Sequence, residues 1–321
     1  MQTLWHSLKK PFFVLAPMEN ITDTVFRRIV ARCGSPDIFF TEFTSTDGLC
    51  SKGYKRVKKH LEFTEAERPI IAQIWGRKPE KFFQAAKMVA DMGFDGIDIN
   101  MGCPARKIIN KGSCSALILN PSLAREIILA TIEGAGALPV SVKTRIGHKD
   151  IITEQWIGFL LEQPIVALTI HGRTVKEMSK VPAHWEEIGK AVQLRNQMKK
   201  EILIVGNGDI VSHADAMDKY ERFKVDGIMI GRGIFNNLWI FRDIDPNTIG
   251  HEEKLRLLID HISLFEKVWS GDRQYDVMKK FFKVYVSGFP NAGDVRLELM
   301  NLQTAKEAIS YIQSHLLNNQ L

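Results

Sequence analysis

The chain has 321 residues, of which 45% are hydrophobic and 25% charged, and its formal net charge at pH 7 is +6. This composition excludes a disordered chain, and the length allows one barrel of about 250 residues plus a smaller domain. The basic excess favours a polyanionic partner without choosing between nucleic acid, a membrane surface and a phosphorylated metabolite. No apolar run approaches the roughly 18 residues of a membrane span, so none is predicted.

The cysteines indicate the redox environment. Cys33, Cys50, Cys103 and Cys114 include no C-x-x-C pair and form no apparent metal-ligand set with the histidines. Reduced thiols in a reducing compartment are the simplest explanation, which predicts a cytoplasmic protein without a bound metal. The opening residues, MQTLWHSLKK, lack the apolar run of a signal peptide.

Short apolar segments alternate with longer amphipathic segments along residues 12–241. Eight expected strands that alternate with helices predict an α/β fold, the (β/α)8 TIM barrel. An open doubly wound sheet is the alternative, but no G-x-G-x-x-G follows the first expected strand. The expected strands are residues 12–16, 37–41, 69–75, 96–100, 139–144, 166–171, 202–206 and 227–230. The expected helices are residues 22–33, 79–92, 122–133, 154–162, 185–193, 213–222 and 234–241.

The composition changes after the last of these units. Pro246 and Gly250 indicate a linker over residues 243–250. Residues 251–321 carry apolar side chains at helical spacing and predict an all-helical C-terminal domain of about four helices. The predicted organisation is a catalytic barrel over residues 1–242, the linker, and this helical domain, whose simplest role is a packing cap.

One loop concentrates residues with chemical potential. Residues 98–117, DINMGCPARKIINKGSCSAL, place Cys103 at the carboxyl end of an expected strand, close to Arg106, Lys107 and Lys111. Catalytic residues occupy such loops in parallel α/β folds. A buried core cysteine beside a turn is the alternative, and it is favoured for the cysteine considered alone.

Polar residues also end the other expected strands, and in a barrel these ends converge on one pocket. Residues 207–209 and 231–233 follow the seventh and eighth strands, where barrels commonly bind phosphate. Tight turns that require glycine are the alternative. The residues expected at the pocket are Pro17, Met18, Glu19, Gln73, Asn100, Lys143, Arg145, His171, Asn207, Gly208, Asp209, Gly231 and Arg232.

The sequence N-x-G-C-P, followed by a basic loop and G-S-x-S-A-L, resembles the signature of the tRNA-dihydrouridine synthases. The resemblance extends over residues 13–242 through LAPMENITD, TEF, AQIWG, VKTRIG, HGRT, NGDI and MIGRG. It implies an FMN-dependent enzyme of the bacterial type that reduces the C5=C6 bond of uridines in tRNA. It also implies that NADPH or NADH reduces the flavin, and we expect a monomer.

The resemblance assigns roles to the residues at the strand ends. Lys143 is expected to bond flavin N1 or O2, Gln73 the pyrimidine edge of the ring, and Pro17 and Met18 to pack against its face. Without the resemblance, core filling would be favoured for Gln73 and Met18. The remaining FMN-binding residues expected are Glu19, His171, Asn207, Gly208, Asp209, Gly231 and Arg232.

Cys103 is expected to donate the proton that accompanies the hydride from reduced flavin. A thiol with the ordinary pKa of about 8.5 is mostly protonated at neutral pH and fits that task. Asn100 and Arg145 are expected to bind the carbonyls of the uracil. Cys114 stands where the family usually has a small residue, and we assign it no chemistry, so that Cys114→Ala should be nearly silent.

A uridine of folded tRNA must be flipped into this pocket, which requires basic residues around the mouth. Arg106, Lys107 and Arg173 are expected to meet RNA phosphates, and the resemblance implies that the helical domain helps to hold the tRNA. Solvated loops are the alternative. Two rival functions are an FMN barrel that reduces a free pyrimidine or a dienone, and an RNA-binding protein without catalysis. Further cations expected near RNA are Lys52, Lys55, Arg56, Lys58, Lys59, Lys111, Lys279, Lys280, Lys283 and Arg296.

Overall fold

The computed structural model describes residues 4–318. The chain forms two compact units, one containing residues up to 24 together with 36–231, and the other containing residues 25–35 together with 232 onward. The first unit therefore ends before the domain boundary predicted at residue 242, and it lacks a segment expected in the barrel. The reason lies in Phe26, whose ring stacks on those of Phe235 and Phe281 at centroid distances of 6.0 and 5.0 Å.

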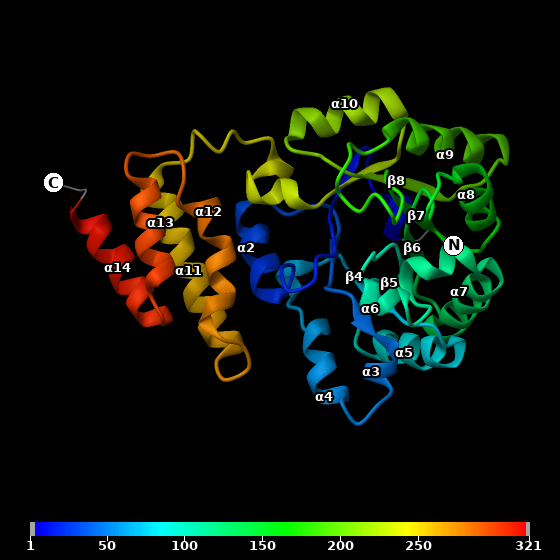
Figure 1. The fold of residues 1–321 in the computed structure, drawn as a ribbon, viewed down its shortest axis with the longest axis horizontal. Coiled ribbons are helices and arrows are strands. Elements are labelled where there is room, and N and C mark those ends of the chain that lie inside the picture. The colour runs from blue at the N-terminus through cyan, green and yellow to red at the C-terminus, as the bar shows by residue number, and fades with distance from the viewer. Residues whose placement is uncertain (1–3, 319–321) are drawn as a thin grey trace. The chain divides into compact units, whose positions relative to one another are not determined.

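Eight parallel strands form a nearly closed barrel in the first unit (Figure 1), which confirms the predicted (β/α)8 fold over an open sheet. The strand order is β1-β9-β8-β7-β6-β5-β4-β2, and a parallel bridge between Val14 and Ile38 joins the two ends. A further short strand, β3 (Thr44–Ser45), pairs with the end of β4 and was not expected. The strands of the ring are β1 (Phe12–Leu15), β2 (Phe39–Phe40), β4 (Ile70–Trp75), β5 (Gly96–Met101), β6 (Val140–Arg145), β7 (Ala167–His171), β8 (Leu203–Asn207) and β9 (Gly227–Ile230).

Amphipathic helices follow β4 to β8, as the alternating pattern predicts. Pro79 and Pro121 each occupy the first turn of a helix, where the missing N–H costs nothing. The side chains of Asn120 and Ser212 cap helices by accepting bonds from the backbone N–H of Leu123 and Asp215. These helices are α5 (Pro79–Asp91), α7 (Pro121–Ala135), α8 (Thr153–Leu161), α9 (Trp185–Gln197) and α10 (His213–Phe223).

Several short elements lie in segments expected to be loops. They contain one or two turns each, which is too short for a hydrophobic period to show in the sequence. The helix predicted at 234–241 is replaced by two 3₁₀ turns, η4 (Arg232–Phe235) and η5 (Ile240–Arg242). The other short elements are α3 (Thr46–Leu49), α4 (Tyr54–Val57), η1 (Lys58–Leu61), η2 (Glu65–Glu67), α6 (Arg106–Ile109) and η3 (Cys114–Leu119).

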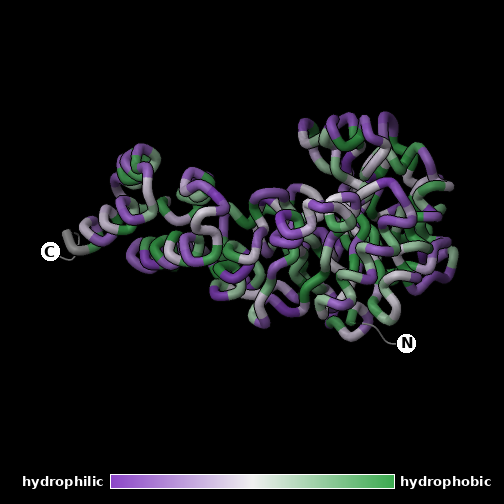
Figure 2. The backbone as a smooth tube through the Cα atoms, turned by 90° about the horizontal axis from the view of Figure 1, so that it is seen from below, coloured by the Kyte–Doolittle hydropathy of each residue, from purple (hydrophilic) through white to green (hydrophobic). Residues whose placement is uncertain are grey.

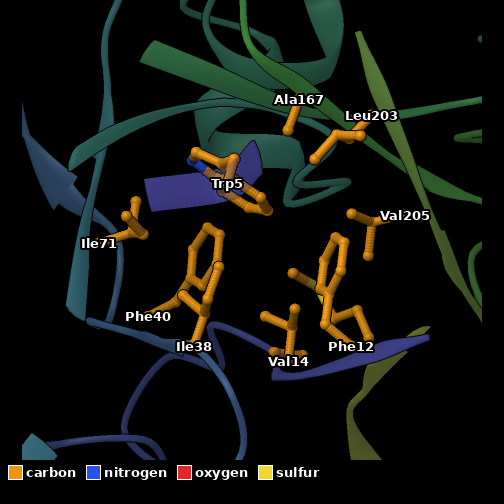
Figure 3. Packing of buried hydrophobic residues seen from close by; sticks show 11 residues of the cluster. Trp5, Phe12, Val14, Ile38, Phe40, Ile71, Ala167, Leu203 and Val205 are labelled. Atoms are coloured by element: carbon orange, nitrogen blue, oxygen red, sulfur yellow. The ribbon is translucent and has the colours of Figure 1, made fainter. Parts of the chain in front are cut away.

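An apolar cluster fills the base of the barrel, at the amino ends of the strands. Trp5, from the short helix α1 (Leu4–Ser7), is 1% exposed, and its ring makes edge contacts with those of Phe12 and Phe40 at 5.9 and 6.4 Å. Figure 3 shows Trp5 among side chains contributed by several strands, including Ile71 and Ala167. The barrel is therefore a packed core at this end and not a pore.

The second unit is built from helices that carry hydrophilic and hydrophobic stretches in turn (Figure 2). Its aromatic core includes His261, whose Nδ1 lies 2.7 Å from the hydroxyl of Tyr285, and burial lowers the pKa of His261 to about 3. In residues 4–318 no helix is both long and apolar enough to cross a membrane. The elements of this unit include α2 (Thr24–Gly34), α11 (His251–Trp269), η6 (Tyr275–Phe281), α12 (Phe282–Tyr285), α13 (Ala292–Asn301) and α14 (Ala305–Asn318).

Candidate active site

A polar layer lies above the apolar base, where the same strands approach their carboxyl ends. Strand β4 contributes Ile71 to the base and Gln73 to the polar layer, and β8 contributes Val205 and Asn207 in the same way. The two members of each pair share a face of the sheet, because successive residues of a strand point to opposite faces. The strand register places Arg145 beside His171, which in turn lies beside Asn207.

A continuous set of hydrogen bonds connects β6 to the loop that follows β5. Asp98 is fully buried and accepts bonds from Ser141 Oγ at 2.6 Å and from Gln73 Nε2 at 2.7 Å. Gln73 Oε1 accepts a bond from Asn100 Nδ2 at 2.8 Å. Asn100 Oδ1 accepts bonds from the backbone N–H groups of Gly102 and Cys103, each at 3.0 Å. Burial raises the pKa of Asp98 to about 6.

Cys103 follows β5 and is half-buried. The thiol of Cys114 donates a hydrogen bond to its sulfur, the backbone N–H of Ala105 adds another, and the charges of Arg145 and Lys143 act in the same direction. Together they lower the pKa of Cys103 to about 6, although burial opposes them. The expectation of an ordinary thiol pKa is therefore wrong for the ligand-free protein, whose surroundings favour the thiolate of Cys103.

Cys114 has a larger part in this site than its sequence context indicates. It is buried in η3, and the hydroxyl of the next residue, Ser115, donates a bond to the backbone carbonyl of Cys103 at 2.8 Å. Burial, followed by its bond to Cys103, raises the pKa of Cys114 well above the ordinary value. The interaction was missed because the two cysteines are not neighbours in the sequence and only the folded loop brings them together.

Lys143 extends from β6 toward β8. Its Nζ donates to Asn207 Oδ1 at 3.0 Å, and Asn207 Nδ2 donates to the carbonyl of Met229 on β9 at 2.9 Å. Burial, assisted by the charge of Arg145, lowers the pKa of Lys143 to about 8. Lys143 thus holds a partly desolvated cation in the polar layer, with Asn207 fixing its position.

Arg145 binds backbone carbonyls of two loops. Its Nε donates to Gly102 at 2.8 Å, and its Nη1 donates to Thr174 and to Met178, each at 3.0 Å. Burial and the nearby charge of Arg173 lower its pKa to about 10. The structure therefore gives Arg145 a part in joining the Cys103 loop to the loop after β7.

Arg173 is 3% exposed and forms part of the loop structure after β7. Its guanidinium pairs with the carboxylate of Asp209, donates to the carbonyl of Val181 at 2.6 Å, and lies 3.1 Å from Nε2 of His171. Asp209 also accepts a bond from the backbone N–H of Ala183 at 2.9 Å. This burial favours a role for Arg173 in positioning His171 and the 207–209 loop over a contact with RNA phosphate.

Glycine allows close approach at one of the two expected phosphate loops. Gly208 has φ +136°, and a Cβ there would lie 2.6 Å from that of Ala183 and 3.3 Å from the ring of His171. At the other loop, Gly231 lies beside Ala16 and the sulfur of Met18. Arg232 follows Gly231 directly, and its side chain is exposed.

Pro17, Met18 and Glu19 follow β1. A turn holds Met18, because its backbone N–H donates to Thr22 Oγ1 at 2.9 Å and its carbonyl accepts from the N–H of Thr22 at 3.0 Å. Glu19 is exposed, and possible metal-ligand atoms of Glu19, Glu42 and His60 lie within 4.8 Å of one another. Acidic groups also cluster without an ion, so we infer no metal from this grouping.

The basic residues expected around the mouth are mainly at the surface. Lys52, Lys55, Arg56 and Lys58 are exposed in the segment before and within α4 and η1, whereas Lys59 is half-buried. Residues Arg106, Lys107 and Lys111 are likewise exposed.

Two further cations near these loops were missed. Arg77 and Lys78 are exposed after β4, and Arg77 Nη1 donates to the backbone carbonyl of Lys111 at 3.3 Å. This bond connects the loops after β4 and β5, so their cations belong to one surface. The G-R-K-P sequence after β4 was the available signal.

Comparison with known sequences gives one consistent result. A sequence model of the Dihydrouridine synthase (Dus) family matches residues 14–321. A probable tRNA-dihydrouridine synthase of Staphylococcus aureus (strain COL) is 46% identical over 310 residues, which cover 96% of this chain and 94% of that protein. A probable tRNA-dihydrouridine synthase 2 of Bacillus subtilis (strain 168) is 44% identical over 309 residues, which cover 95% and 94% of the two chains.

Comparison with solved structures supports the barrel. The chain is similar to 2-naphthoyl-CoA reductase with a TM-score of 0.58 and 13% identity, over 75% of this chain and 51% of that one. It is similar to morphinone reductase with a TM-score of 0.53 and 14% identity, over 74% of this chain and 87% of that one. At these identities the similarity establishes the fold and no more.

Proposed function

The chain belongs to the dihydrouridine synthase family, and we propose that it is a tRNA-dihydrouridine synthase that uses FMN to reduce the C5=C6 bond of uridines in tRNA. The observation that carries this proposal is the position of Cys103. Its sulfur lies on the loop after β5, under the influence of Lys143 and Arg145, at the end of a barrel where catalytic residues collect.

The polar layer has donors that fit a flavin ring. Lys143 presents an ammonium with three N–H donors, of which one bonds Asn207. Thr169 pairs in register with Lys143, and its buried hydroxyl has no hydrogen-bond partner among the described residues. A ring with carbonyl oxygens and nitrogens would satisfy such groups. We assign FMN to Pro17, Met18, Glu19, Gln73, Lys143, His171, Asn207, Gly208, Asp209, Gly231 and Arg232.

When bound and reduced, FMN would supply the hydride, with NADPH or NADH as the source of electrons. Cys103 holds the proton for the other carbon of the uracil double bond. A thiol with a pKa of about 6 is a stronger acid than an ordinary one, but it must first be protonated. A negatively charged ligand bound beside Lys143 and Arg145 would offset the effect of these cations, which favour the thiolate. We therefore expect Cys103 to be protonated to a greater extent in the assembled complex than in the ligand-free protein.

Asn100 retains an N–H on Nδ2 that can bond a uracil carbonyl after its bond to Gln73 is counted. We assign Arg145 to recognition of the uracil as well, through the Cys103 loop and the loop after β7 that it joins. We assign Arg173 to the support of His171 and Asp209. Arg106, Lys107 and the other exposed cations near the β4 and β5 loops would hold the RNA backbone. The helical C-terminal segment is proposed to bind tRNA as well.

The proposal is tested by anaerobic single turnover. Protein purified with its flavin is reduced with NADPH, mixed with unmodified tRNA transcript, and followed by the return of oxidised-flavin absorbance. We expect the extracted flavin to be FMN, reoxidation by tRNA, and dihydrouridine in the RNA by mass spectrometry. Free uridine at equal concentration is the comparison. Reoxidation by free uridine as fast as by tRNA would indicate a small-molecule reductase instead.

A further inference from the structure

The hydrogen bonds between Asp98 and the Cys103 turn admit only one direction for the two amides involved. Backbone N–H groups can only donate, so the groups of Gly102 and Cys103 require the Oδ1 of Asn100 to face them. Nδ2 of Asn100 must then face Gln73, which requires Gln73 to present Oε1. The orientation of both amides therefore follows from the direction of the backbone N–H groups alone.

The far end of this set requires an acceptor. Gln73 directs Nε2 at Asp98 Oδ2 over 2.7 Å, and a carboxylate supplies that acceptor. Gln73 and Asp98 are 0% exposed and Asn100 is 6% exposed, so water cannot replace a missing partner at low cost. A change at Asp98 must therefore be transmitted along the set or leave a buried amide unpaired.

We propose that Asp98 is a positioning residue that fixes, through Gln73 and Asn100, the backbone turn on which Cys103 is carried. A second consequence follows for ligands. Both lone pairs of Asn100 Oδ1 are occupied by the turn, so Asn100 has only an N–H left to offer a ligand. Gln73 accepts one bond on Oε1 and donates one from Nε2, so it keeps one lone pair and one N–H. At Asn100 the site therefore selects ligands that present a carbonyl oxygen. The inference rests on the proposed function only for its meaning in catalysis.

The charge of Asp98 and its hydrogen bond act on Cys103 in opposite directions. Removing a negative charge from the polar layer favours the Cys103 thiolate, which lowers the pKa of the thiol. Releasing the turn disfavours the thiolate, because the bond from the N–H of Ala105 depends on the turn geometry. The other groups acting on the thiol are Cys114 from η3 and Lys143 and Arg145 from β6. Two substitutions at Asp98 separate the effects.

The experiment is alkylation of Cys103 by iodoacetamide as a function of pH in the full-length protein freed of flavin, followed by mass spectrometry of the peptide that contains Cys103. Asp98→Asn keeps an acceptor for Gln73 and should leave the midpoint unchanged or slightly lower. Asp98→Leu keeps the number and branching of the side-chain heavy atoms, provides no acceptor, and should raise the midpoint by about one pH unit. Alkylation at pH 6 should then slow about fivefold, as mass action requires for that shift.

Ser141→Ala is the matched control. It removes a bond of similar length to the same carboxylate, on the oxygen that does not face Gln73, and it should leave the profile unchanged. Gln73→Leu breaks the next link while keeping Asp98, and it should reproduce the shift if Asp98→Leu does not fold. Thermal unfolding confirms that each variant is native.

Three results would overturn the inference: an unchanged profile in both leucine variants, an equal shift in Ser141→Ala, or an equal upward shift in Asp98→Asn. The measurement uses neither flavin nor tRNA. A shifted profile in a protein that fails to reduce tRNA uridine would therefore reject the proposed function and keep the role of Asp98, and the reverse combination would do the opposite.

Discussion

The base and the mouth of the barrel are made by the same strands and differ in what holds them together. At the base, Trp5, Phe12 and Phe40 pack with aliphatic side chains and exclude water. At the mouth, residues only two positions further along, such as Gln73 after Ile71, are connected by directed hydrogen bonds. Apolar packing is non-directional, whereas each hydrogen bond at the mouth dictates its neighbour. Stability and chemistry are thus separated along each strand.

The largest effect is expected from removing the thiol at the mouth. Cys103→Ala should retain FMN, reduction by NADPH and tRNA binding, but flavin reoxidation by tRNA should slow by roughly 10²–10⁴, the usual contribution of a positioned acid. Cys103→Ser should recover little, because a hydroxyl is a far weaker acid than a thiol. Anaerobic single turnover measures the rate, and reoxidation at the parent rate would remove Cys103 from the reaction.

The base should respond in stability and not in chemistry. Trp5→Ala leaves a cavity among Phe12 and Phe40 and should lower the free energy of unfolding by about 3–5 kcal/mol. Trp5→Phe, as the control, should lose less because it keeps an aromatic ring there. Denaturant unfolding gives the free energy. The pH profile of Cys103 alkylation should match the parent protein, and a shifted profile would show that base and mouth are coupled.

Cations at the mouth should matter for RNA binding, whereas a cation at the base should not. Arg77→Ala combined with Lys107→Ala should weaken tRNA binding and reduce the slope of log affinity against log salt by about two, one for each phosphate that the protein no longer neutralises. Lys200, exposed beside a hollow at the base with Lys10 and Asp226, provides the control substitution Lys200→Ala. A slope for the double variant equal to that of the parent protein would exclude the β4 and β5 loops from RNA binding.

The smallest effect is expected from the second thiol. Because the Cys114 thiol is the largest cause of the low Cys103 pKa, Cys114→Ala should raise that pKa toward its ordinary value. In the ligand-free protein the thiolate would then form at higher pH, so alkylation of Cys103 near pH 6 should slow. Cys114→Ser, which keeps a donor of similar size, should move the profile less. An identical profile for Cys114→Ala would return Cys114 to a packing role.

The sequence predicted the barrel because a buried strand is long enough to leave an apolar run between turn residues. It did not predict the place of Trp5, since a helix of four residues has no period to detect. The segment 25–35 was placed in the barrel by its position in the chain, although the aromatic contacts of Phe26 place it with later helices.

The site shows the same division. Residues at the strand ends were recognised by type and place, but the bonds among them depend on strand register. A signal was present: Asp98 and Asn100 are two positions apart in a buried strand, as are Ser141 and Lys143, so each pair shares a face. The low pKa of Cys103 depends on a loop contact with Cys114 that spacing alone does not determine.

The seam of the barrel has a kinetic consequence. Between β1 and β2 the ring is completed by one bridge and few backbone bonds, among them Leu15 N–H to the carbonyl of Ile38 at 3.2 Å. Strand β2 itself has two residues, whereas β5 and β6 pair over five. Local opening occurs most readily where the fewest backbone hydrogen bonds must break. Amide hydrogens at this seam should therefore exchange with solvent before those of β5 and β6. The barrel would then open transiently next to Met18, while the turn that carries Cys103 keeps its conformation.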